Sequence, residues 1–143
     1  MIHLEAQGSF EVRLAPQAVA ETAGATGLAR MSIVKAFHGD LEAASAGEML
    51  SFSSADPGSA GYVAMEKVSG VLHGRHGSFV LQHSSTMDRG TPHQSIVVVP
   101  GSGTGQLRDL SGSMTVLITQ AAHGYRFDYQ LPATPTGADT PPR

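Results

Sequence analysis

The feature that most constrains the fold is a segment of alternating residues from 59 to 90 with a glycine-marked turn near its middle. Successive side chains of a β-strand point to opposite faces, so each half of the segment predicts a long strand. The first strand places Tyr62 and Glu66 on one face. The second gathers its bulkier side chains on one face, which consists of Phe79, Leu81, His83, Ser85 and Met87. The segment therefore predicts an antiparallel hairpin.

Three ionisable residues lie among apolar neighbours in the middle of predicted strands, namely Lys35, Glu66 and His83. A buried imidazole needs a hydrogen-bond partner, because an unsatisfied polar group costs about 1–3 kcal/mol. Glu66, on the partner strand of the hairpin, is the nearest candidate in the sequence for His83. Ionisable groups held in a cavity have shifted pKa values and are suited to acid–base chemistry. We therefore predict these three as the candidate catalytic residues, against the alternative that they form a structural ion pair that fixes strand register.

The rest of the chain continues the same alternation. Further strands are predicted over residues 2–14, 30–38, 41–53, 95–99, 113–119 and 125–131, and a long loop over 16–28 with room for one helical turn at 17–21. About eight strands joined mostly by short turns are typical of an antiparallel meander, which removes its exposed edges by closing. We predict an all-β fold, a closed eight-stranded antiparallel barrel, with a two-layer sandwich as the alternative.

Composition indicates one domain. The chain has 143 residues with 17 Gly, 8 Pro and 15% charged residues, as in turn-rich β proteins. Residues 1–131 are predicted to form the barrel. The remaining residues, 132–143, are rich in proline and small residues and are predicted to be a disordered tail, because they lack the apolar side chains needed for a core.

Charge and cysteine content exclude several functions. The net charge of -3 offers no basic face for a phosphate backbone, so we expect no nucleic-acid partner. Cysteine is absent, which removes disulfides and thiolate metal sites. The first residues have no basic leader followed by an apolar run, and no apolar stretch reaches about 18 residues. We therefore expect a cytoplasmic protein without a membrane partner.

Three local patterns resemble known sites but fail on inspection. His73 and His76 flank a predicted turn with no acidic residue close by, so no metal site is predicted. The glycines at 101, 103 and 105 lack the following glycine and the Gly-Lys-Ser or Gly-Lys-Thr of phosphate-binding loops, which indicates a turn. His83 and Ser84 point to opposite faces of one strand, which argues against a hydrolase triad.

Four motifs occur in a joint order that resembles a bacterial family, domain of unknown function 3224. They are the HGDLE turn, the GYVAxE strand, the HGRxGSFVLQH hairpin and the GTGxLxxLxG approach to the seventh strand, and the resemblance covers most of residues 30–131. The family is grouped with allene-oxide-cyclase-like barrels, so the resemblance implies an eight-stranded antiparallel barrel that is often oligomeric. It implies no catalytic residues.

Together these observations predict a protein that holds a small apolar molecule in the bore of the barrel. The residues predicted to contact the ligand are Tyr62, Phe79, Leu81, Met87, Tyr125 and Tyr129. Two functions fit such a bore: a cofactor-independent cyclase or isomerase, and a carrier or sensor without chemistry. A structural module with a filled barrel is the third alternative. We expect no cofactor, and a homo-oligomer with a dimer favoured, because residues 95–99 are apolar on both faces.

Overall fold

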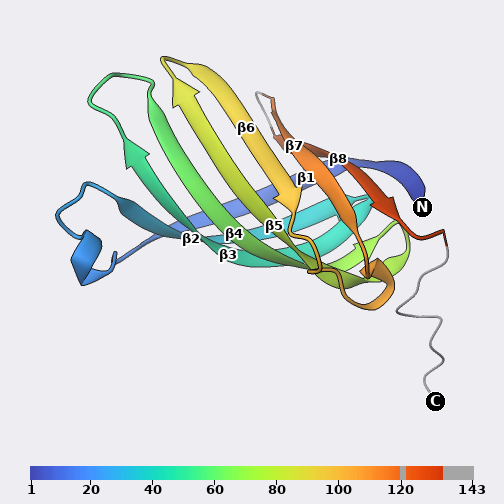
Figure 1. The fold of residues 1–143 in the computed structure, drawn as a ribbon. Helices are drawn as coiled ribbons and strands as arrows, with labels where there is room; N and C mark the ends of the chain where they lie inside the picture. The colour runs from blue at the N-terminus through green and yellow to red at the C-terminus, as the bar shows by residue number, and fades with distance from the viewer. Residues whose placement is uncertain (120–121, 134–143) are drawn as a thin grey trace.

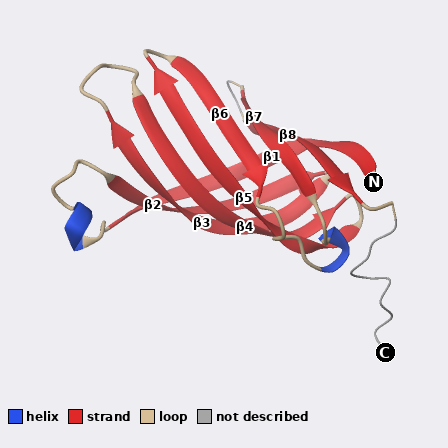
Figure 2. Cartoon of the chain, in the orientation of Figure 1, coloured by secondary structure: helices blue, strands red, loops and turns tan. Residues whose placement is uncertain are grey.

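The structure is a computed structural model that describes residues 1–119 and 122–133. It consists almost entirely of β-strands (Figure 2). The strands are β1 (Ile2–Gln17), β2 (Ala29–Gly39), β3 (Leu41–Ser53), β4 (Ala60–Leu72), β5 (Arg75–Asp88), β6 (Thr91–Val98), β7 (Ser111–Ile118) and β8 (His123–Leu131). Two single-turn 3-10 helices, η1 (Glu21–Ala23) and η2 (Gly105–Leu107), lie in connections. No helix in the described part of the chain is long and apolar enough to cross a membrane.

The eight strands form a closed barrel in which each strand is antiparallel to its neighbours and β1 pairs with β8 (Figure 1). This confirms the predicted architecture and rules out the sandwich. The seam between β6 and β7 is the weakest part of the wall, because these strands share one register pair, Val97 with Ser113. Near the seam, the Gln94 side-chain Oε1 accepts a hydrogen bond of 2.8 Å from the backbone N–H of Val116.

Strand boundaries differ from the predicted ones where tertiary pairing extends a strand beyond its alternating pattern. β1 continues to Gln17 because it pairs with β2 as far as Arg30. The single helical turn of the long loop lies at 21–23, slightly later than predicted. β6 begins at Thr91 and includes Pro92, whose register partner on β5 is Met87.

The apolar core fills the closed half of the barrel, at the end where β2 turns into β3 and β4 turns into β5. Alternation selects this core as predicted, because the buried side chains are the inward-facing ones of each strand. Aromatic rings dominate it: Phe79 stacks on Phe127 at 5.7 Å between centroids, and Phe127 stacks on Tyr129 at 5.3 Å. The η2 connection adds the fully buried Leu107.

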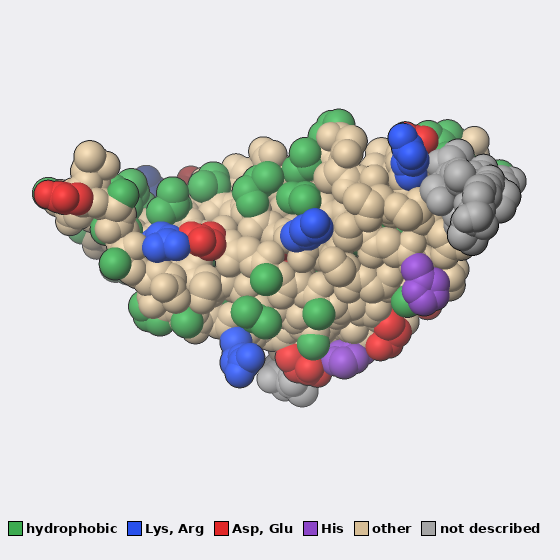
Figure 3. Space-filling model, turned by 90° about the horizontal axis from the view of Figure 1, so that it is seen from below, with side chains coloured by type: hydrophobic (Ala, Val, Ile, Leu, Met, Phe, Trp, Pro, Cys, Tyr) green, Lys and Arg blue, Asp and Glu red, His purple; other side chains and the backbone are tan. Residues whose placement is uncertain are grey.

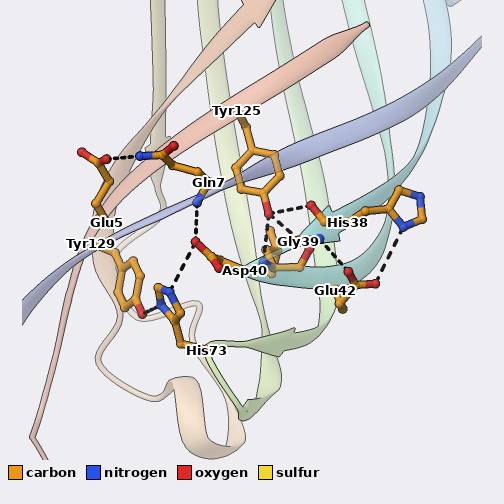
Figure 4. Close-up of polar contacts among 10 residues, drawn as sticks. Glu5, Gln7, His38, Gly39, Asp40, Glu42, His73, Tyr125 and Tyr129 are labelled. Atoms are coloured by element: carbon orange, nitrogen blue, oxygen red, sulfur yellow. Dashed lines mark hydrogen bonds and ion pairs between the residues drawn. The ribbon is translucent and has the colours of Figure 1, made fainter.

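Polar contacts hold this closed end together (Figure 4). The Tyr125 hydroxyl accepts a hydrogen bond of 2.9 Å from the Leu41 backbone N–H and donates one of 3.0 Å to the His38 carbonyl. The Tyr129 hydroxyl is hydrogen-bonded to His73, which lies 3.5 Å from the Asp40 carboxylate. These contacts tie β8 to the turns after β2 and β4.

The beginning of the predicted tail is attached to the barrel. The Arg75 guanidinium donates hydrogen bonds to the carbonyls of Pro132, at 2.9 Å, and Ala133, at 3.1 Å. Residues 134–143, the remainder of the tail predicted to be disordered, lie outside the described residues.

Candidate functional site

Four neighbouring strands each contribute one polar side chain to a cluster inside the barrel. Lys35 lies on β2, Ser45 on β3, Glu66 on β4 and His83 on β5, and all four are buried. Their strands are hydrogen-bonded neighbours, with Lys35 opposite Ser45, Gly47 opposite Glu66, and Ala64 opposite His83. We call these four residues the Glu66 cluster.

Glu66 is the centre of the cluster. Its Oε1 accepts hydrogen bonds from the Lys35 ammonium at 3.0 Å and from the His83 Nε2 at 2.7 Å, and its Oε2 accepts one of 2.6 Å from the Ser45 hydroxyl. The Glu66 side chain is 0% exposed. A buried carboxylate with three such partners is compensated for the loss of water, which is the requirement for keeping an ion inside a protein.

The environment keeps Glu66 ionised. Burial by itself raises the pKa of the Glu66 carboxyl, but the hydrogen bond from His83, the nearby Lys35 charge and the hydrogen bond from Ser45 together outweigh it and lower the pKa to about 2. Glu66 is therefore a carboxylate at neutral pH. A carboxylate this stable is a weak base, so its role is to hold and orient its two neighbours.

The charge on Glu66 also determines which ring nitrogen of His83 carries a hydrogen. A carboxylate is a hydrogen-bond acceptor only, so the His83 Nε2 that contacts it must carry the hydrogen. In a neutral ring, the hydrogen on Nε2 leaves Nδ1 with a free lone pair. The contact with the Glu66 carboxylate therefore fixes the orientation of the imidazole through Nε2.

Lys35 marks the boundary between the cluster and the aromatic core. Its ammonium lies 4.9 Å from the centroid of the Phe10 ring and 5.7 Å from that of Phe37. A cation over an aromatic face is stabilised by the ring quadrupole, and the effect grows when water is excluded. The cluster therefore separates the filled half of the bore from the half that opens to solvent.

A cavity of about 330 Å³ occupies the open mouth of the barrel. Met49 and Ser85, which line it, are the next inward-facing residues after Gly47 and His83 on the way to the mouth. Tyr62 lines it as well, with its ring 6.5 Å from the His83 ring. The mouth cavity thus begins one inward-facing position beyond the Glu66 cluster, and none of the four cluster residues lines it.

The structure divides the sequence-predicted residues into two groups. The three candidate catalytic residues, Lys35, Glu66 and His83, come together within hydrogen-bond distance. Of the predicted ligand contacts, Tyr62 and Met87 line the mouth cavity. The other four are packed in the core of the closed half and do not line the mouth cavity: Phe79, Leu81, Tyr125 and Tyr129.

Sequence reasoning missed several members of the site. Ser45 completes the bonding of Glu66, and Met49, Ser85 and Ile118 line the mouth cavity. Ser85 shares a face with His83 by alternation, so that pattern places it near the site. No local pattern identifies Ser45, because its contact with Glu66 depends on the register between β3 and β4.

Two other features lie apart from this site. A larger hollow of about 830 Å³ lies outside the barrel, between the loop carrying η1 and outward-facing side chains such as Leu50, Val63 and Met65. His83 is also among the residues that line this hollow, although its imidazole contacts Glu66 inside the barrel. Within the described residues, no group of three or more histidine or acidic side chains is arranged to bind a metal ion.

Comparisons with known proteins place the chain in a family without assigning it an activity. The family profile described as "Protein of unknown function (DUF3224)" matches residues 6–129. A crystal structure of a DUF3224 protein of unknown function from Shewanella oneidensis MR-1 is similar, with 45% sequence identity and a TM-score of 0.85 over 92% of this chain and 98% of that one. No curated protein matches. The chain therefore belongs to the DUF3224 family.

Proposed function

We propose that the protein binds one small, largely apolar molecule in the mouth cavity, with the polar group of the molecule directed towards His83. The observation that carries this proposal is the open cavity at the mouth of the barrel, whose lining residues Met49 and Ser85 are the next inward-facing positions beyond the level of the Glu66 cluster. Ligand sites in proteins combine mostly apolar walls with a few placed polar groups. The mouth cavity has this composition, with Met49, Met87 and Ile118 among its apolar side chains.

The size of the cavity favours binding over a purely structural barrel. A structural module would fill its bore with its own side chains, as this protein does in the closed half. The mouth instead leaves about 330 Å³ open, which falls in the range of roughly 300–1,000 Å³ typical of ligand pockets.

Native mass spectrometry of the purified protein tests the proposal. A bound molecule should appear as a mass adduct, and Ser51→Phe, which fills the cavity, should remove it. Leu50→Phe on the same strand is the matched control, because Leu50 is exposed on the outer face. An adduct that survives Ser51→Phe, or that disappears with Leu50→Phe alone, would contradict binding in the mouth.

A second candidate function is cofactor-independent isomerisation or cyclisation, the activity suggested by the grouping with allene-oxide-cyclase-like barrels. The specific observation that favours it is the Glu66–His83 contact, since an oriented imidazole is suited to remove a proton from carbon. The Lys35 ammonium shares the same carboxylate oxygen and adds positive charge beside the reacting group. A carrier or sensor would use the same cavity without this step.

Hydrogen exchange in the bound molecule separates the two functions. The molecule identified by mass spectrometry is incubated with the protein in D₂O and followed by NMR. Catalysis predicts deuterium incorporation that His83→Gln abolishes, while Ser84→Ala on the outer face leaves it unchanged. Incorporation at equal rates in the wild type and His83→Gln would contradict a basic role for the imidazole, and no incorporation in the wild type would favour the carrier.

We also propose that the barrel forms a homodimer through its outer face. The supporting observation is a group of exposed apolar side chains on the neighbouring strands β2, β3 and β4: Val34, Leu50, Val63 and Met65. Exposed apolar side chains grouped on one surface mark interaction sites.

A further inference from the structure

The seam between β6 and β7 is weakly paired on the side of the mouth. Each of these strands pairs with its other neighbour over eight positions, whereas in the described structure the two share one register pair, Val97 with Ser113. β6 begins at the mouth, where Pro92 and Gln94 line the cavity, and runs towards the closed half. The part of the seam between this register pair and the mouth therefore lacks a regular ladder.

A side chain takes the place of a backbone hydrogen bond in this part of the seam. Continuing the register beyond Val97 and Ser113 places Gln94 opposite Val116. The Val116 N–H donates a hydrogen bond of 2.8 Å, and its acceptor is the Gln94 side-chain Oε1. In a regular antiparallel ladder the acceptor is a backbone carbonyl of the neighbouring strand. The Gln94 amide thus bridges two strands that have moved apart.

The sequence of β6 prevents this part of the seam from closing into a ladder. Backbone groups of successive residues in a strand point to opposite sides, and the Val99 N–H donates to the Val80 carbonyl of β5 at 2.9 Å. Odd-numbered residues of β6 therefore face β5, and even-numbered ones, including Pro92 and Gln94, face β7. Pro92 has no N–H to donate, and proline in sheets is confined mainly to unpaired edges. The opening is therefore encoded in the strand itself.

The open part of the seam reaches the level of the Glu66 cluster. Ile96 is the first residue of β6 beyond the register pair, and it lies directly opposite His83 on β5. The continued register places Ile96 opposite Met114 of β7, and both side chains belong to the buried apolar core. The mouth cavity ends one inward-facing position short of the imidazole. Separation of β6 from β7 would draw Ile96 and Met114 apart and extend the cavity to His83.

We infer, on the basis of the binding function proposed above, that β6 and β7 separate at this seam to admit the ligand from the mouth cavity to the His83 imidazole. Opening costs less here than at any other seam, because the Gln94 bridge and apolar packing hold the strands on the mouth side of Val97. Each of the other seams is held by a ladder of eight or more register pairs.

Chemical labelling of the imidazole tests the inference without a ligand. Diethyl pyrocarbonate modifies accessible histidines, and peptide mass spectrometry gives the rate for each one. Because the chain has no cysteine, Ser95→Cys with Thr115→Cys, opposite each other in the continued register, introduces one disulfide that locks the seam. Oxidation should slow the modification of His83 by about tenfold or more, because local opening is blocked, and reduction should restore it. The exposed His38 and His76 should react at the same rate in both forms.

A second disulfide controls for general stabilisation of the fold. Ala44→Cys with Ser69→Cys joins β3 and β4 on the outer face, within a continuous ladder. It closes a loop of comparable length, so its effect on global unfolding should be similar. This disulfide should leave the His83 rate unchanged. Slowing equal to that of the locked seam would show that global unfolding exposes His83, and would overturn the inference.

Gln94→Leu tests the bridge independently of any disulfide. Leucine keeps the bulk of the side chain and removes the acceptor, so modification of His83 should become about fivefold faster, the usual effect of one neutral hydrogen bond. Gln82→Leu, on the outer face of β5, is the matched control and should leave the rate unchanged. Equal His83 rates with the seam locked and free, or no effect of Gln94→Leu, would overturn the inference. Binding in the mouth is judged separately, by the mass adduct and its loss in Ser51→Phe, so the two can fail independently.

Discussion

At the scale of single residues, Glu66 determines the chemistry of the barrel interior. Its carboxylate is removed from water and satisfied by a lysine, a histidine and a serine. Pairs of this kind contribute little net stability when compared with apolar residues, because desolvation offsets the attraction. Removing one partner is costly, however, since it leaves the other charge buried. These two effects can be measured through the pH dependence of the unfolding free energy and through the stability of double variants.

The lowered pKa of Glu66 predicts a specific loss of stability in acid. The pKa falls from 4.5 to about 2 on folding, so the unfolded chain binds more protons between these values. The stabilisation is therefore complete above about pH 4.5 and is lost as the pH falls towards 2. By urea denaturation, the difference in unfolding free energy between the wild type and Glu66→Gln should shrink by about 3 kcal/mol from pH 5 to pH 2. The exposed Glu21 is the control, and an equal change for Glu21→Gln would contradict the assignment.

Substitution of the ion pair should give strongly non-additive effects. Glu66→Gln leaves the Lys35 ammonium buried beside Phe10 without its counterion and should destabilise the fold by about 3–5 kcal/mol. Lys35→Met keeps the length of the side chain and removes the charge, so the double variant should be less destabilised than the sum of the single ones. Chemical denaturation measures all three. Additivity within about 0.5 kcal/mol would show that the two charges do not interact.

At the scale of elements, the strands hold the cluster in place through close backbone approach. Gly47 on β3 is opposite Glu66 on β4, and a Cβ at this glycine would lie 2.0 Å from the Met65 carbonyl oxygen and 2.7 Å from the Glu66 Cα. The absence of a side chain lets β3 and β4 pack closely at the point where Ser45 reaches the carboxylate. The glycine therefore supports the site without contacting a ligand.

Gly47→Ala should consequently be destabilising even though alanine is a small residue. The contact is with backbone atoms, which cannot rotate away, so we expect a loss of about 1–3 kcal/mol in urea denaturation, the usual cost of overpacking. Gly61→Ala on β4 is the matched control, because its nearest neighbour would be at an ordinary 3.7 Å. Equal stability of the two variants would contradict the close approach.

At the scale of the whole molecule, the barrel exposes apolar side chains on its outer face as well as burying them in its core. Figure 3 views the molecule from below and shows hydrophobic side chains in scattered groups over that face, with charged side chains and histidines between them. Val63 is 53% exposed and Met65 48%. Alternation places Val63 and Met65 on one face of β4, and the structure shows that this face is the outer one. The proposed dimer accounts for their apolar character.

A charge placed on this face should therefore dissociate the dimer. Light scattering coupled to size exclusion should report twice the chain mass for the wild type and one chain mass for Val63→Lys, because a buried unpaired ammonium opposes association. Gln130→Lys on the outer face of β8 should remain dimeric. A monomeric wild type, or a Val63→Lys variant that stays dimeric, would contradict an interface on this face.

Much of this architecture follows from local pattern. The alternation in residues 59–90 defines β4 and β5 and places Tyr62 with Glu66, and Phe79 with His83, on shared faces, because side-chain direction in a strand depends on the parity of the position. The number of strands and their short connections then favour closure. Alternation likewise places Lys35 on one face with Phe37, and the structure shows that this face is the inner one.

The contacts of the Glu66 cluster and the position of the mouth cavity could not be predicted from local pattern. They depend on the register between strands and on how much of the bore is filled by side chains. Ser45 contacts Glu66 only in the observed pairing of β3 with β4, and a shift by one residue would turn it outward. Phe79 and Met87 share one face of β5, yet Phe79 is packed in the core and Met87 lines the cavity, since the barrel is filled at one end and open at the other. Sequence thus determined which residues of each strand share a face, because the side-chain period of a strand is two, and three-dimensional packing decided which face lines the bore and over what depth side chains fill it.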